Sequence, residues 1–149
     1  MTIEERAQLA RSYFTSGYNC AQAVALAFCD VTGLDKETTA KALGGFGGGM
    51  GRMREVCGTV SGMVFVAGFL KPYTDISNPA AKKENYAFVQ SLAATFKEEN
   101  GSIICRVLLG GPDGASTDPT PAPRTENYYK KRPCVELVAC AVRILAAEL

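Results

Sequence analysis

The chain has 149 residues, with six cysteines, no histidine and 16 basic against 15 acidic side chains. The missing histidine excludes Cys–His and Ser–His–Asp catalysis, and the near-neutral charge offers no basic stripe for nucleic acid. We expect one domain over residues 1–149, because a chain of this length can bury about 70% of its unfolded surface. Such a core needs no cross-links, so the cysteines have another purpose.

The N-terminus carries no sign of export. Residues 1–5 lack the basic n-region and the apolar stretch of a signal peptide. The longest uncharged apolar stretch, Val56–Leu70, has 15 residues, whereas a membrane span needs about 20. We therefore expect a cytoplasmic protein that is not embedded in a membrane. In that reducing compartment, cysteine clusters more often serve metal or redox chemistry than structural disulfides.

Three helices are predicted in the first third of the chain. Thr2 and Glu5 form a capping box that opens a helix to about residue 14. Asn19 is a good N-cap for a second helix over residues 20–30, which is apolar on most sides. Asp35 caps a third helix, which ends at residue 43 where glycines follow.

A glycine-rich loop then leads into a buried helix. Residues 44–51 include six glycines, too many for regular structure. The helix over about residues 55–70 that follows carries Gly58 and Gly62 on one face, where another backbone can approach closely.

The second half of the chain is also predicted to be helical. An Asn-Pro pair opens a helix over residues 79–100, and Ser102 caps a short helix that contains Cys105. Residues 110–124 include four prolines and are predicted to form a long surface loop or lid. A last helix begins near Pro133. With no pattern typical of a sheet, the expected fold is all-α: a compact single-domain bundle of about six helices.

Four of the cysteines lie near predicted helix starts. These are Cys20, Cys57, Cys105 and Cys134. Helix N-termini favour a thiolate over a thiol, and basic residues flank three of these four positions: Arg52, Arg54, Arg106, Lys130, Lys131 and Arg132. Since positive charge also lowers the pKa of a thiol, we expect the four cysteines to act as thiolates.

The other two cysteines are predicted to be core residues. Cys29 lies nine positions after Cys20 and Cys140 six after Cys134, spacings that place each on a different helix face from its neighbour. Free cysteine is among the most buried residue types. Neither is therefore expected to join a site built from the other four.

Three motifs connect the chain with a known family. The runs YNCAQAV (18–24), GFGGGMGR (45–52) and CGTVSG (57–62) resemble the C_GCAxxG_C_C family of redox-active proteins, and Cys105 and Cys134 match its later cysteines. Thr59 stands where the family usually has alanine, so its hydroxyl could alter hydrogen bonding to the nearby sulfur. The resemblance implies four functional cysteines and a redox role without a settled reaction.

More remotely, the pattern is similar to the non-haem iron–sulfur part of split-Soret cytochromes. Haem itself is excluded, because the chain has neither a CxxCH motif nor a histidine.

An iron–sulfur cluster for electron transfer is the first functional hypothesis. Four cysteines are its usual ligand set, here Cys20, Cys57, Cys105 and Cys134. Their separations of 37, 48 and 29 residues differ from the tight runs of ferredoxins, but a folded bundle could still assemble them at one end. The sequence identifies neither the redox partner nor the metal.

Two alternatives stay open. The same cysteines could perform dithiol–disulfide exchange or redox sensing, in pairs such as Cys20 with Cys57 and Cys105 with Cys134; sequence cannot choose among the three possible pairings. Alternatively, the protein could be a non-redox helical domain that binds structural zinc or another ligand.

The glycine loop does not fit a nucleotide site. It lacks the Gly-Lys-Ser/Thr ending of a P-loop, and no strand precedes it. We expect instead that it brings backbone N–H groups near the sulfur of Cys57 or of a cluster, or that it lets helices cross closely. The predicted cofactor-binding residues are Gly47, Gly48, Gly49, Arg52 and Gly58. The small apolar helix surfaces are also compatible with a homodimer.

Overall fold

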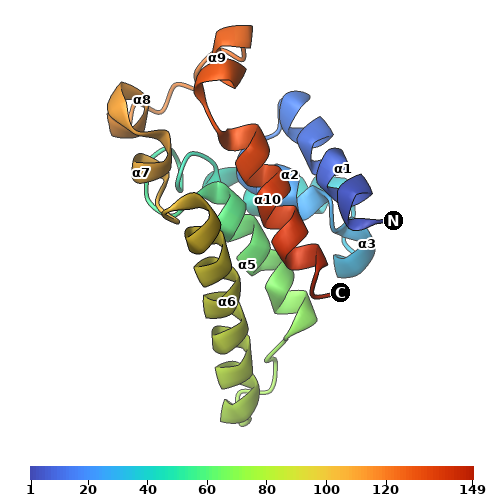
Figure 1. Ribbon diagram of the computed structural model, residues 1–149. Helices are drawn as coiled ribbons and strands as arrows, with labels where there is room; N and C mark the ends of the chain where they lie inside the picture. Colours follow the sequence, from blue (N-terminus) through green and yellow to red (C-terminus); the bar gives the residue numbers. More distant parts are fainter.

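The computed structural model describes all 149 residues and contains ten α-helices, one 3-10 helix and no strands (Figure 1). In chain order the elements are α1 (Ile3–Thr15), α2 (Cys20–Leu26), α3 (Cys29–Thr32), α4 (Lys36–Leu43), η1 (Gly44–Phe46), α5 (Gly58–Leu70), α6 (Pro79–Asn100), α7 (Cys105–Leu109), α8 (Gly111–Ala115), α9 (Glu126–Lys131) and α10 (Cys134–Ala146). The predicted all-α class is confirmed, and the helix count is higher than expected.

The predicted helix starts at four N-caps are confirmed. The side chains of Thr2 and Asn19 each accept a hydrogen bond from the backbone N–H of the third helical residue. The side chain of that residue in turn accepts a bond from the backbone N–H of the cap, so both form capping boxes. Asp35 accepts a bond from the N–H of Thr38 at 2.7 Å. Asn78 caps α6 with Pro79 in its first turn. These bonds are local, which is why the sequence reveals them.

The helix predicted over residues 20–30 is in fact two helices, α2 and α3, separated at Ala27 and Phe28. The cause lies outside the segment. The guanidinium of Arg6, buried on α1, donates to the Ala27 carbonyl at 2.6 Å and lies 4.7 Å from the centre of the Phe28 ring. That carbonyl is therefore held by a side chain, and the helix is interrupted there.

Other boundaries differ because two segments pair before their helices begin. Val56 and Ile104 form an antiparallel bridge, and the N–H of Cys105 donates to Glu55 O at 2.6 Å. This extended pairing delays α5 until Gly58 and α7 until Cys105. Ser102 is consequently not the cap of α7; its hydroxyl accepts from the N–H of Ile104 at 3.0 Å.

Three short elements account for most of the remaining difference from about six helices. The 3-10 helix η1 occupies the start of the glycine loop, α8 lies inside the predicted proline-rich loop, and α9 precedes the last helix. In η1 and α8 the glycines and prolines conceal single turns of helix, whereas α9 contains neither residue type and is capped by Thr125.

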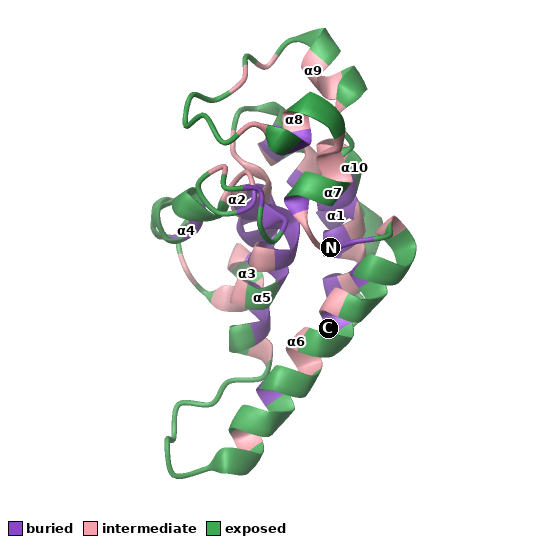
Figure 2. Cartoon of the chain, turned by 90° about the vertical axis from the view of Figure 1, so that its left-hand side faces the viewer, coloured by how far each residue is buried: buried purple, intermediate pink, exposed green.

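A continuous core of 24 buried residues holds the bundle together. In this core α1 packs against α10, and α2 packs against α5 (Figure 1). The glycine face predicted on α5 is used as expected: a Cβ at Gly62 would lie 2.8 Å from the Cβ of Val24 and 2.9 Å from the Ala21 carbonyl oxygen on α2. By contrast, the first half of α6 and the segment before it extend away from the core with mostly exposed residues (Figure 2).

No helix combines the length and apolar character needed to cross a bilayer. The starts of α2, α5, α7 and α10 lie toward the same end of the bundle, above the packed core in the view of Figure 1. That end carries the four cysteines singled out in the sequence.

Candidate functional site

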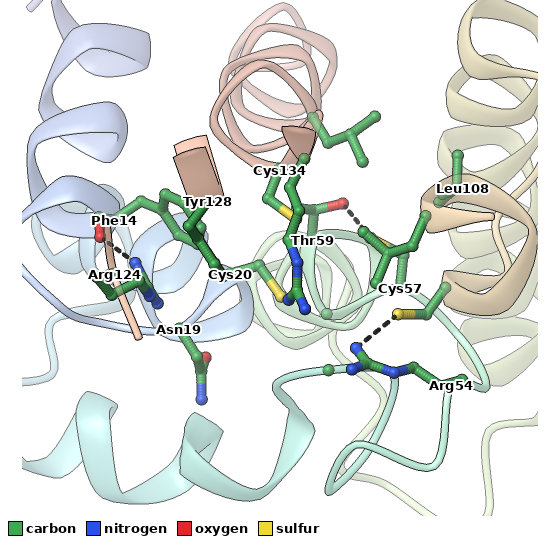
Figure 3. A pocket seen from close by; sticks show the side chains of 16 residues that line it. Phe14, Asn19, Cys20, Arg54, Cys57, Thr59, Leu108, Arg124, Tyr128 and Cys134 are labelled. Atoms are coloured by element: carbon green, nitrogen blue, oxygen red, sulfur yellow. Dashed lines mark hydrogen bonds between the residues drawn. The ribbon is translucent and has the colours of Figure 1, made fainter. Parts of the chain in front are cut away.

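Cys20, Cys57, Cys105 and Cys134 line one small cavity of about 70 Å³ (Figure 3). Cys57 and Cys105 are buried and the other two are half-buried. The remaining wall combines apolar, aromatic and cationic side chains with two glycines of the predicted site: Phe14, Asn19, Gly48, Arg54, Gly58, Thr59, Leu108, Leu109, Arg124, Tyr128, Arg132 and Leu137. Four sequence segments far apart in the chain thus supply thiols to one place.

Each thiol occupies a helix start. Cys20, Cys105 and Cys134 are the first residues of α2, α7 and α10, and Cys57 is the N-cap of α5. The prediction of four cysteines at helix starts is confirmed, although Cys105 and Cys134 lie one or two positions nearer the helix start than the sequence suggested.

Cys20 and Cys134 are each coupled electrostatically to the other three thiols. The charge of Cys20 would raise the pKa of both Cys57 and Cys134, while Cys105 raises the pKa of Cys20 itself. The close approach of α5 fixes the position of Cys20, because a Cβ at Gly58 would overlap its sulfur. The backbone of Gly48 lies near Cys20 and lowers its pKa in part.

The expectation that the helix termini and cations keep these thiols ionised is wrong for three of them. Burial raises the pKa of Cys20 and Cys57 above the ordinary value, and it raises the pKa of Cys134 to about 12. The charges of Arg132 and Arg124 lower the pKa of Cys134 only in part. Removal from water disfavours the charged form more strongly than the cations favour it, so these thiols are neutral at pH 7.

Two polar side chains contact the sulfurs directly. Arg54 is 1% exposed, and its Nη1 donates to the sulfur of Cys105 at 3.7 Å. The Thr59 hydroxyl lies 3.1 Å from the sulfur of Cys57 and lowers its pKa in part. The contact expected from the threonine that replaces the family's usual alanine is therefore present (Figure 3).

The glycine loop lies against two of the thiols. A Cβ at Gly49 would meet the Cβ of Cys105 at 2.7 Å, and the backbone of Gly48 acts on Cys20 rather than on Cys57. Gly47 and Arg52 line a second, adjoining cavity instead of the thiol cavity. The loop backbone thus lies close to two of the four cysteines, although not to the predicted Cys57.

The remaining cysteines lie outside the cavity, as predicted, but neither is fully buried. Cys29 begins α3, with its sulfur 3.6 Å from the hydroxyl of Thr39. The thiol of Cys140 donates to Glu99 at 2.9 Å, and partial burial together with this contact raises its pKa to about 11. The core assignment holds only in part: Cys140 packs against the core but stays partly exposed, and Cys29 lies beside the buried Thr39 outside the core cluster.

The basic residues next to the cysteines have unequal roles. Arg54 and Arg132 line the thiol cavity, whereas Arg106, Lys130 and Lys131 do not. The side chain of Arg106 is about half exposed and lies 4.0 Å from Glu55. Adjacency in sequence therefore identified only part of the cationic wall.

Arg124 and Tyr128 are site residues that sequence reasoning missed. The guanidinium of Arg124 donates to the carbonyls of Phe14 and Tyr18 at 2.8 and 3.1 Å and stacks 4.3 Å from the centre of the Phe14 ring. Tyr128 lies between Arg124 and Arg132, 5.0 and 4.6 Å from their guanidinium carbons. A proline-rich segment gave no local signal that its last residue returns to the cysteine end.

The thiols do not form a ready-made site for a single ion: no three or more cysteine, histidine or carboxylate side chains are placed to hold one metal. Their chemistry nevertheless suits a thiolate-ligated group, because four sulfurs, the buried Arg54 and two partly buried arginines enclose one cavity.

Comparison with protein families gives one match. Residues 18–148 match the family described as "Putative redox-active protein (C_GCAxxG_C_C)". The chain belongs to this family. Neither the curated proteins nor the solved structures gave a match. The family match covers all four site cysteines and the glycine loop; it does not test the remoter similarity to split-Soret cytochromes.

Proposed function

We propose that Cys20, Cys57, Cys105 and Cys134 hold one iron–sulfur cluster and that the protein transfers electrons through it. The observation that carries this proposal is the convergence of four thiols, from four separate helix starts, on one cavity. Four cysteines are the usual ligand set of [2Fe–2S] and [4Fe–4S] clusters, and family membership supports a redox role.

The raised thiol pKa values favour a metal centre over free thiols. A neutral thiol is a poor nucleophile for disulfide exchange, and burial keeps Cys20, Cys57 and Cys134 neutral at pH 7. Metal coordination deprotonates a thiol outright, so the same burial that disfavours exchange chemistry is compatible with ligation.

The protein's own groups would set the properties of such a centre. A bound cluster supplies reversible electron transfer at a potential that depends on charge, hydrogen bonds to sulfur and solvent exposure. Arg54 and Arg132 would offset the negative charge of the thiolates, and Thr59 and the Gly48 backbone would stabilise individual sulfurs. Phe14 and Leu137 in the cavity wall would limit access of water.

Dithiol–disulfide chemistry is the second candidate function, and one observation favours it. The thiols are close enough for their charges to interact, with Cys20 as one common neighbour, yet no three are grouped to hold a single ion. Cys20 could therefore form a disulfide with one neighbour at a time, provided that an external oxidant accepts the two electrons.

The two candidate functions predict proteins that differ in metal content and in visible absorption. We would purify the protein without oxygen, record its visible spectrum, and measure iron, acid-labile sulfide, zinc and free thiols on the same sample. Matching iron and sulfide, with visible absorption that bleaches on reduction, is the result expected for a cluster. Colourless protein without metal, which reversibly loses thiols in pairs on oxidation, would overturn the cluster proposal in favour of dithiol chemistry. Zinc with redox-inert thiols would overturn both.

A further inference from the structure

A second cavity, of about 390 Å³, adjoins the thiol cavity and is lined by four arginines, Arg52, Arg54, Arg124 and Arg132. It shares Arg54, Arg124 and Arg132 with the thiol cavity, whereas Arg52 belongs to the second cavity alone. Two arginines come from the glycine loop and two from the segment around α9. No carboxylate lines this cavity.

The protein neutralises these cations only in part. Arg132 lies 3.4 Å from Asp113, and Asp118 acts electrostatically on Arg52. The other hydrogen bonds of these guanidiniums go mainly to backbone carbonyls: Arg52 donates to Thr120 O, Arg54 to Ser116 O and Arg124 to Phe14 O and Tyr18 O. A carbonyl accepts a hydrogen bond but does not cancel a full charge.

Three buried guanidinium nitrogens in the chain have no partner, and two of them belong to the arginines of this cavity. These two are Nε of Arg52 and Nη2 of Arg54. Arg54 is 1% exposed, and its side chain lines both cavities. Buried donors in proteins are nearly always satisfied, because an orphaned donor carries its full desolvation cost. The protein therefore holds these arginines in place at an energetic cost.

The backbone is strained where these arginines are held. Arg52 and Arg54 both have φ of 62°, a left-handed conformation that non-glycine residues rarely adopt. The loop's own hydrogen bonds maintain it, from Arg52 N–H to Gly47 O and from Arg54 N–H to Gly48 O. Strain of this kind clusters at ligand sites, where the surrounding structure holds it in place. The positive charges of Arg54 and Arg132, after burial, also lower the pKa of Arg52.

From these observations we propose that the arginine-lined cavity binds a small oxoanion of the phosphate or sulfate type, free or as the charged group of a larger molecule. The planar guanidinium fork matches such oxygens in pairs, and four arginines with no carboxylate among them line the cavity. The bound anion would lie beside the thiol cavity, next to the walls that the two cavities share. This inference goes beyond the proposed cluster and does not depend on it.

A competing explanation is that the arginines only offset the charge of the thiol centre. Arg54, which contacts Cys105, fits that role. Arg52 does not, since it lies outside the thiol cavity. Arg52 is therefore the residue that separates the two explanations.

The test is calorimetric titration of the full chain with inorganic phosphate, sulfate and pyrophosphate at constant ionic strength, with chloride as the reference anion. We expect saturable binding at one site, and we expect Arg52→Gln to weaken it about tenfold or more, the effect of losing one charged hydrogen bond. Arg106→Gln is the matched control, because this exposed arginine next to Cys105 lines neither cavity; its affinity should stay within about twofold of the parent.

Three results would overturn the proposal. The first is no saturable heat beyond that of chloride, and the second is an equal loss of anion affinity in Arg52→Gln and Arg106→Gln. The third is loss of anion binding in Cys57→Ser, which leaves the residues of the arginine cavity unchanged. If circular dichroism shows that Arg52→Gln is unfolded, Arg52→Lys takes its place, because lysine keeps the charge but loses the planar fork and should also weaken binding. Because Cys57→Ser removes a proposed cluster ligand and keeps the arginines, it separates failure of the anion site from failure of the cluster proposal.

Discussion

The packed middle of the bundle and its cysteine end are built on opposite principles. In the middle, α2, α5 and α10 bury alanines, valines and glycines against one another, and Ala21, Val24 and Val142 are fully buried. At the cysteine end, the starts of α2, α5, α7 and α10 meet around thiols, a buried arginine and a loop with three non-glycine residues at positive φ: Met50, Arg52 and Arg54.

The two regions therefore contribute differently: the packed middle stabilises the fold, whereas the cysteine end supplies the reactive groups. The middle lowers the free energy of the fold through removal of apolar surface from water. The cysteine end instead carries costs, namely partnerless donors, strained backbone and buried thiols. Proteins accept such costs where a site requires them. Substitutions in the two regions should therefore change different measurements.

The largest expected effect is at the cysteine end. Cys57→Ser and Cys134→Ser should abolish the iron and the visible absorption, because each removes one of four proposed ligands. The matched control is Cys29→Ser, whose sulfur lies near Thr39 and outside the cavity; it should retain both. Metal analysis and visible spectra measure the effect, and equal loss in Cys29→Ser would show that the assignment of the site is wrong.

The second expected effect concerns thiol ionisation in the metal-free, reduced protein. Burial raises the pKa of Cys134 to about 12, so at pH 8 its thiolate fraction should be about a thousandfold below that of an ordinary cysteine of pKa about 8.5. Alkylation by iodoacetamide, followed by mass spectrometry across pH, should give a rate that still rises above pH 10. Cys140, whose pKa is about 11, is the internal control and should react first.

The same shift has a consequence for stability. Because the folded thiols keep their protons when the unfolded ones lose them, the stabilisation is present below about pH 8.5 and is lost as the pH rises toward 12. Denaturant titrations at pH 7 and pH 10 would detect this loss. An alkylation rate that levels off by pH 8 would contradict both expectations.

The third effect compares two glycines on one face of α5. In Gly62→Ala the new methyl would press on Val24 and on the Ala21 carbonyl, which cannot easily move, so the free energy of unfolding should fall by about 1–3 kcal/mol with the redox centre retained. In Gly58→Ala it would displace the Cys20 sulfur, so bound iron should fall more than stability. Denaturant unfolding and metal content measure the two outcomes, and identical behaviour of the variants would remove the distinction between the regions.

The smallest effect is expected at Thr59. Removal of its hydroxyl in Thr59→Ala leaves the Cys57 sulfur without its 3.1 Å neighbour, which should raise the pKa of Cys57 further and cost about 0.5–1.5 kcal/mol of stability. Thr59→Ser keeps the hydroxyl and serves as the control. The alkylation rate of Cys57 reports the change; faster reaction in Thr59→Ala than in the parent would refute the assigned role of the contact.

The sequence predicted what depends on local or linear patterns. Capping residues such as Asn19 and Asp35 act on their own helices, and the family pattern together with the helix starts singled out the four cysteines that share the cavity. These features can be read without knowledge of the tertiary structure.

Features that depend on distant contacts could not be predicted. The break at Ala27 needs Arg6 from another helix, and Arg124 reaches the site across more than a hundred positions of sequence. The sign of the thiol pKa shifts depends on burial, which outweighs the nearby cations. In each case the deciding interaction is created only when the bundle assembles.

The segment from Gly110 to Arg124 has the composition of a loop that a protease would cut first. Here arginines hold it at regular intervals: Arg54 binds the carbonyl of Ser116, Arg52 binds that of Thr120, and Arg124 itself anchors to α1 and to Tyr18. A protease needs an extended strand, so it must first break these attachments. Breaking them would also free Arg124 from its place in the wall around the thiols. Resistance to digestion and shielding of the sulfurs therefore have the same molecular cause.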